Sequence, residues 1–415
     1  MKVSSFFTYF WILYFPLCIA FYDKSWIPQW IDEAMTLGLV LYTGLRFGKI
    51  RKNGVKKEVW AYLSIMMFYL AYSLWLAVNV SASVFLDFQQ QIRPYSVFYC
   101  TWLLSPRFKK EQLNFIMWAM YATIALYLPT AIGRAEDVAI GQLCLNCAMM
   151  YYLFNPETKR NVRITLLIAS IALVSPKMKF IGEYVALIGV LYFLKGRMKV
   201  LSMKSAIYMA LLTVAIIFFT WTKFESYFVT GLDRTGYDRM ARPESYRAAM
   251  LIMFDYIPFG SGLGTFATNA AAEYYSPLYY KYGLNEIWGL TPDRPMFLAD
   301  AFYPTLAEYG LFGVFLFVVF WKRRLYSIQK MPTLKLYKVG LLAFFALALE
   351  SVADTSYLSG KGMGYFMILG LVMSLADRQR LINKRFQGLE EDSMYKPFEK
   401  EQRIENGNNN HSTIT

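Results

Sequence analysis

Histidine, cysteine and charge are all scarce in this chain of 415 residues, which has one histidine, four cysteines and 17% charged residues. The histidine, His411, lies in the polar C-terminal end and is a poor candidate for catalysis. The cysteines lie within or at the edges of apolar runs, where a thiol behaves as a small hydrophobic group, so no disulfide framework is predicted. The CxxC pair of Cys144 and Cys147 has no further ligand nearby in the sequence. We therefore expect neither a metal site nor a cofactor.

Hydrophobic residues, in contrast, make up 56% of the chain, and aromatic residues make up 18%. This composition is too apolar for a soluble protein of this size. Apolar runs long enough to cross a bilayer as helices recur from one end to the other, which predicts an all-α integral membrane protein with about twelve transmembrane helices. The predicted spans are residues 6–22, 31–47, 59–78, 88–104, 113–131, 138–154, 162–175, 180–194, 205–222, 303–321, 336–353 and 362–376. The first run lacks a convincing cleavage site, so we expect a retained span and not a signal peptide.

Lysine and arginine collect in every second connection between these spans, which predicts the orientation of the chain. The basic connections are residues 48–58, 105–112, 155–163, 195–204 and 322–338. We expect these connections and both termini to be cytoplasmic, so the net charge of +14 reflects topology and attraction to anionic lipid, not nucleic-acid binding.

This topology divides the chain into four parts. Residues 1–222 hold nine transmembrane helices, 223–302 form one long outer loop carrying short helices, 303–376 hold the last three transmembrane helices, and 377–415 form a cytoplasmic tail that we expect to be disordered. A loop of about 80 residues in a compact membrane protein is usually functional. The long loop is therefore the first place to look for a site.

Four cations outside the long loop are predicted at the outer face, against the usual bias: Arg93, Arg134, Lys177 and Lys179. We expect Arg93 and Lys177 or Lys179 to bind an anionic substrate group, because cations kept there against the bias are candidate site residues. Snorkelling to lipid headgroups is the alternative. Glu183 follows Lys179 by four residues and is its predicted ion-pair partner.

The long loop contains "SYRAAMLIMFDYIPFGSGLGTF", which predicts a short helix beginning near Arg247 and then a glycine-rich turn. Gly260, Gly262 and Gly264 permit backbone conformations in which consecutive N–H groups converge on an anion, and Arg247 can share that anion. A guanidinium binds two phosphate oxygens at once, so we expect Arg247 to be the most sensitive residue in the chain. A tight turn without a ligand is the alternative interpretation of the glycines.

Two carboxylates follow the loop. Asp300 and Glu308 are eight residues apart, near one face of a predicted helix, so either can accept a proton from a substrate hydroxyl or neutralise a cation such as Arg247. Aromatic residues also crowd the loop, where they can stack on sugar rings or anchor the chain at the headgroup level.

The segment "SYRAAMLIMFDYIPFGSGLGTF" followed by "DAFYPTLAEYGLFGVFLF" resembles the O-antigen polymerase and ligase family, polytopic proteins that join lipid-carried sugars at the outer face of the bacterial inner membrane. The likeness covers about 70 residues closely, and the span plan and "IRPY" at Arg93 also fit. By this resemblance, Arg247 falls on the family's loop arginine and Glu308 on its Glu before Gly310. Lys177 or Lys179 falls on a basic turn.

The resemblance implies a metal-independent polymerase of undecaprenyl-pyrophosphate-linked oligosaccharide repeat units, with Arg247, Asp300 and Glu308 as catalytic candidates. It also implies, as partners, the lipid-linked oligosaccharide, the bilayer and a chain-length regulator protein. Ligases of the family carry a His before an Asn where this chain has Ala299 and Asp300, which favours a polymerase over a ligase. A ligase or related transferase is the first alternative. A flippase or transporter is the second, although we find no internal repeat of the kind typical of transporters.

Overall fold

The structure is a computed structural model, and it describes residues 1–22, 30–132, 138–198, 202–231 and 239–383. Within these ranges the regular structure is helical and no strand forms, which confirms the predicted all-α class. The tail expected to be disordered begins at residue 377, but residues 377–383 are helical. The rest of that tail and Arg134, expected at the outer face, lie outside the described ranges.

A helix lies at each of the apolar runs singled out in the sequence. In the N-terminal part these helices are α1 (Val3–Tyr14), α2 (Ile31–Gly44), α3 (Asn53–Leu76), α4 (Ser81–Leu104), α5 (Lys110–Ile132), α6 (Ala139–Phe154), α7 (Lys159–Ser170), α8 (Met178–Ile188) and α9 (Met203–Phe219). After the long loop they are α14 (Gly310–Gln329), α15 (Leu334–Ala353) and a last helix over residues 363–383. The loop itself contains α10 (Trp221–Phe224), α11 (Ala241–Asp255), α12 (Asn269–Glu273) and α13 (Pro277–Lys281).

Three of the described helices are long and apolar enough to cross a membrane: Val3–Ala20, in which a π-helical turn continues α1, together with α3 and α5. A fourth is possible if Ile207–Phe219 and Trp221–Tyr227, which meet at a bend of 86°, count as one span. The predicted number of twelve is therefore not confirmed. Some of the other apolar runs form shorter or broken helices, such as α7 and α8, and others carry several charges, as α14 does with Lys322, Arg323 and Arg324.

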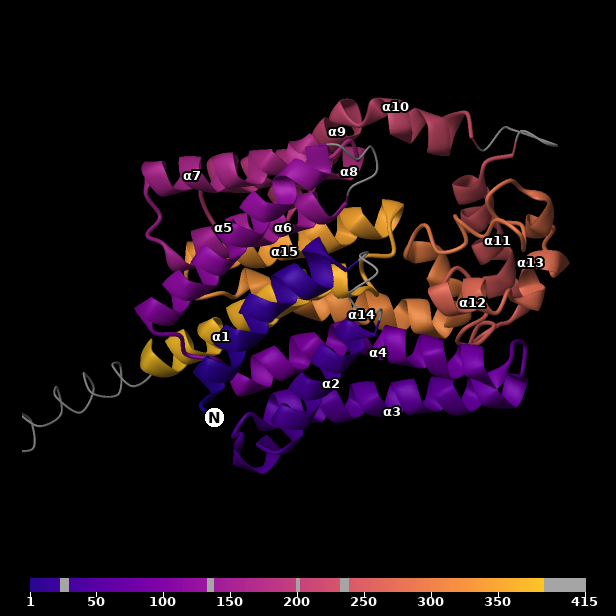
Figure 1. Ribbon diagram of the computed structural model, residues 1–415, viewed down its shortest axis with the longest axis horizontal. Helices are drawn as coiled ribbons and strands as arrows, with labels where there is room; N and C mark the ends of the chain where they lie inside the picture. Colours follow the sequence, from indigo (N-terminus) through magenta and orange to yellow (C-terminus); the bar gives the residue numbers. More distant parts are fainter. Residues whose placement is uncertain (23–29, 133–137, 199–201, 232–238, 384–415) are drawn as a thin grey trace, which may run out of the picture.

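The long antiparallel helices α3 and α4 lie side by side and form a hairpin along one side of the molecule (Figure 1). The short helices α11, α12 and α13 gather at the end where this hairpin turns, and the N-terminus lies towards the other end. Most side chains of α6 and of residues 363–376 are buried, so these two helices form the centre of the main hydrophobic core. The four cysteines are buried and free, as predicted.

Candidate functional site

The glycine-rich turn after α11 is packed tightly against α3, α4 and the start of α14. Gly260, Gly262 and Gly264 all have positive φ angles, which L side chains rarely adopt. A Cβ at Gly260 would lie 2.3 Å from the backbone nitrogen of Gly310, and one at Gly264 would lie 2.6 Å from the carbonyl oxygen of Ser83. The glycines are therefore required by close backbone packing, in agreement with the tight-turn interpretation.

The N–H groups of this turn do converge on anions, but the anions belong to the chain itself. The N–H of Gly264 donates to Asp87 Oδ2 at 2.9 Å, and those of Thr265 and Phe266 donate to Glu308 Oε1 at 2.7 and 2.8 Å. The N–H of Gly262 donates to the Glu308 carbonyl oxygen at 3.0 Å. The expected binding of a substrate phosphate by these N–H groups is therefore wrong for this conformation, because other acceptors occupy them.

Glu308 is fully buried, and Gln91 Nε2 lies 3.5 Å from its Oε2 and 3.4 Å from Asp87 Oδ1. A buried carboxylate that accepts several N–H bonds fixes the backbone around it. We interpret Glu308 as a structural acceptor, because none of its surface is exposed to a substrate hydroxyl. The sequence patterns did not indicate Asp87 as its neighbour, since Asp87 lies just before the predicted span 88–104 and Glu308 lies in the predicted span 303–321.

Arg247 lies on α11 with its side chain 70% exposed, and its guanidinium is 3.9 Å from Glu244 on the same helix. It does not share an anion with the glycine turn, because the N–H groups there are already bonded. The arginine of α11 that meets a predicted site residue is instead Arg242, whose Nη2 lies 2.5 Å from Asp300 Oδ2. Arg242 lies only five residues before Arg247, in "ARPESYR", and spacing along the sequence does not show which of the two meets Asp300.

Asp300 has a partly exposed side chain, at 28%, and three charges act on it. Burial raises the pKa of its carboxyl above the usual value, the charge of Arg242 opposes that rise, and Asp354 adds to it. Lys177 also acts on Asp300 through its charge. A partly exposed carboxylate with a raised pKa, close to cations, is suited to accepting a proton from a bound hydroxyl.

Lys179, near the start of α8, forms ion pairs with two carboxylates at the end of α15. Its Nζ is 2.8 Å from Glu350 Oε2 and 2.7 Å from Asp354 Oδ2. The predicted pairing with Glu183 is wrong, because the ammonium pairs with Glu350 on α15 and with Asp354 just after it. Glu183 instead receives a hydrogen bond from Tyr365 at 3.3 Å. Burial alone would raise the pKa of Asp354, but the charge of Lys179 lowers it below its usual value.

Arg93 is also paired. Its guanidinium donates to Asp32 and Glu33 at the start of α2, and its side chain is almost fully buried. Asp32 additionally accepts the N–H of Gly360 at 2.9 Å, so this ion pair holds the connection between α15 and the last helix. The two carboxylates neutralise the charge of Arg93, and its side chain lies in the interior of the protein. We had expected an exposed cation that binds a substrate phosphate.

Several charged residues meet where α8, α11 and α15 approach one another. We call them the outer charge cluster, after the face of the membrane to which the lysine and arginine pattern assigns them. Its members are Lys177, Lys179, Arg242, Asp300, Glu350 and Asp354. Lys177 is partly exposed, and among the described residues it has no carboxylate within ion-pair distance. No group of three or more metal-ligating side chains occurs in the described part of the chain.

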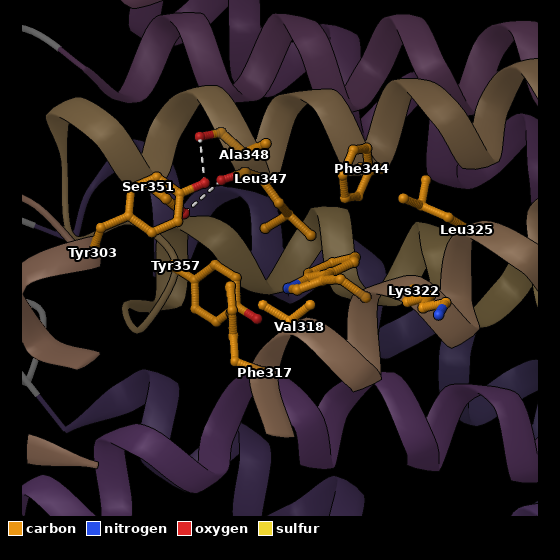
Figure 2. Close-up of a pocket in the computed structure, with 11 residues that line it drawn as sticks. Tyr303, Phe317, Val318, Lys322, Leu325, Phe344, Leu347, Ala348, Ser351 and Tyr357 are labelled. Carbon is orange, nitrogen blue, oxygen red and sulfur yellow. Dashed lines mark hydrogen bonds between the residues drawn. The ribbon is translucent and has the colours of Figure 1, made fainter. Parts of the chain in front are cut away.

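An aromatic cavity of about 350 Å³ lies between α14 and α15 (Figure 2). Tyr303, Ser351 and Tyr357 line one end of the cavity, and the N–H of Phe302 donates to the Ser351 carbonyl oxygen at 3.0 Å. Tyr303 lies three residues after Asp300, and Ser351 and Tyr357 lie three residues on either side of Asp354. The cavity is therefore mainly apolar and carries hydroxyl groups at one end, which suits a ligand that is mostly apolar.

No protein-family model matches the chain, and no curated protein matches it significantly. The family likeness in the sequence therefore remains a resemblance, and function has to be argued from the outer charge cluster.

Proposed function

We propose that the chain polymerises undecaprenyl-pyrophosphate-linked oligosaccharide repeat units into O-antigen or a capsular or secreted polysaccharide. The reaction takes place at the periplasmic face of the bacterial inner membrane. In this proposal the chain crosses the membrane about twelve times with both termini in the cytoplasm, as the lysine and arginine pattern predicts. The observation that carries the proposal is the outer charge cluster, in which a partly exposed Asp300 lies beside Arg242 and within the field of Lys177.

This arrangement supports a glycosyl transfer that needs no nucleotide. The acceptor hydroxyl oxygen bonds to the anomeric carbon of the donor as the bond from that carbon to the pyrophosphate oxygen breaks, and undecaprenyl pyrophosphate leaves with the bonding electrons. Asp300 accepts the hydroxyl proton, which its raised pKa favours. Lys177 stabilises the negative charge that develops on the pyrophosphate, because its ammonium has no close carboxylate in the described structure.

The test uses a bacterial host that assembles the cognate repeat unit but lacks its own polymerase. We expect the chain to restore a ladder of long glycans on electrophoresis. Asp300→Asn should abolish long chains, since loss of a general base costs about 10² to 10⁴ in rate. Asp293→Asn is the matched control, because Asp293 is an exposed carboxylate of the same loop. Membrane abundance is measured for both variants.

Three outcomes contradict the proposal. Full-length ladders from Asp300→Asn at normal abundance remove Asp300 from the reaction. No ladder from the unmodified chain argues against a polymerase, and transfer of preformed glycan to lipid A core without chain extension identifies a ligase.

A further inference from the structure

A second cavity lies between α3, α4 and α14, away from the outer charge cluster, and it contains two arginines. Its volume is about 180 Å³, room for about six waters, which is more than a single trapped water needs. The polar and aromatic groups that line it include Glu58, Tyr62, Tyr95, Tyr99, Arg323 and Arg324. The proposed polymerase chemistry does not use these residues.

Arg324 is the unusual member of this group, because its side chain is only 2% exposed. Its Nη2 donates to Glu58 at 2.7 Å, and its guanidinium lies over the ring of Trp102 with a centroid distance of 4.9 Å. The Nε and Nη1 atoms are buried and have no hydrogen-bond partner among the described residues. Leaving such donors unpaired is costly, so the geometry points to an acceptor that enters the cavity.

The charges of the cavity indicate an anion. Arg323 and Arg324 face a single carboxylate, Glu58, so one positive charge remains for a ligand to balance. Arg323 is exposed and has no ion-pair partner in the described structure. A phosphodiester carries one negative charge, and its oxygens match the planar donor fork of a guanidinium.

The apolar side chains that line the cavity indicate that the bound anion carries an apolar chain. Ile65, Leu316 and Phe320 line the cavity beside the aromatic groups. The helix α3 is one of those long and apolar enough to span a membrane, and only four of its 24 residues are buried, whereas Trp60 and Met67 are among its exposed residues. The arginines lie near the end of α14 in the basic segment 322–338, where positive charge attracts anionic headgroups.

We propose that this cavity is a binding site for an anionic phospholipid, with its phosphate held by Arg323 and Arg324 and its chain lying along α3 and α14. The proposal stands apart from the polymerase function and holds for a transporter or a ligase equally.

The test uses the full chain purified in mild detergent. Native mass spectrometry should detect a retained phosphatidylglycerol or cardiolipin, and added phosphatidylglycerol should raise the thermal unfolding temperature more than phosphatidylcholine does. Arg323→Gln should weaken phosphatidylglycerol binding by about tenfold, the loss expected for one hydrogen bond to a charged group. Arg324→Gln should weaken it at least as much.

Lys330→Gln is the matched control, because Lys330 lies in the same basic segment but does not line the cavity. If Arg324→Gln does not fold, Arg323→Gln decides, since that side chain is exposed. The proposal is overturned if phosphatidylcholine stabilises equally, if inorganic phosphate alone gives the same shift, or if Arg323→Gln binds phosphatidylglycerol as tightly as Lys330→Gln does.

Discussion

At the scale of single residues, the two arginines of α11 have opposite environments. Arg242 is held by Asp300 and lies over the ring of Tyr227 at 4.4 Å, whereas Arg247 is 70% exposed. We expect Arg242→Lys to impair polymerisation by about tenfold or more, because a lysine keeps the charge but loses the fork and the stacking. Arg247→Lys should change activity little. Glycan length and membrane abundance are measured for both, and the reverse order of sensitivity would support the family-based assignment of Arg247.

The ion pair of Lys179 and Asp354 makes stability depend on pH. The pKa of Asp354 is lower in the folded chain than in the unfolded one, so its stabilising effect is present above the unfolded pKa of about 4 and is lost as the pH falls through the folded value. The unfolding temperature of Asp354→Asn should therefore lie below that of the unmodified chain at pH 7, and the gap should close below about pH 4. A gap that stays constant from pH 7 to pH 3 would show that the carboxylate charge is not responsible.

At the scale of elements, alanine substitutions of two glycines with similar backbone conformations can distinguish the cost of backbone strain from the cost of a steric clash. Gly264 has a φ of +70° and Ser83 within 2.6 Å of an added Cβ, whereas Gly283 has a φ of +65° and open space around it. Gly283→Ala should cost only the backbone strain, about 1 kcal/mol. Gly264→Ala should cost more and loosen the turn, which hydrogen exchange of residues 260–268 would detect. Equal costs for the two variants would mean that the turn is not pinned against α4.

The sequence predicted the helices well and their partners poorly. Apolar runs and basic connections depend on neighbouring residues, so each predicted span coincides with a helix. The predicted span 303–321 begins earlier than α14, because residues 303–308 form a 3₁₀ helix and α14 starts only at Gly310, whose φ is +59°. The contacts of the candidate site join residues far apart in the chain, such as Lys179 and Glu350, which are separated by 171 positions. Spacing along one helix favoured Glu183 as the ion-pair partner of Lys179. Tertiary packing brings Glu350 to Lys179 instead.

At the scale of the whole molecule, the orientation in the membrane is the prediction on which the proposed function depends. The short helices α11 to α13 gather at the end where the α3–α4 hairpin turns (Figure 1), and the lysine and arginine pattern assigns that end to the periplasm.

The four native cysteines are buried, so they should not react with a membrane-impermeant maleimide and need not be replaced. Single cysteines at two exposed positions therefore report topology directly: Glu273→Cys in the long loop and Asn53→Cys in a basic connection. In intact cells with a permeabilised outer membrane, we expect labelling at Glu273→Cys alone, and both sites should react after the inner membrane is disrupted. Labelling of Asn53→Cys before disruption would reverse the topology and place the outer charge cluster at the cytoplasmic face. The proposed polymerase function would then lack access to a periplasmic substrate.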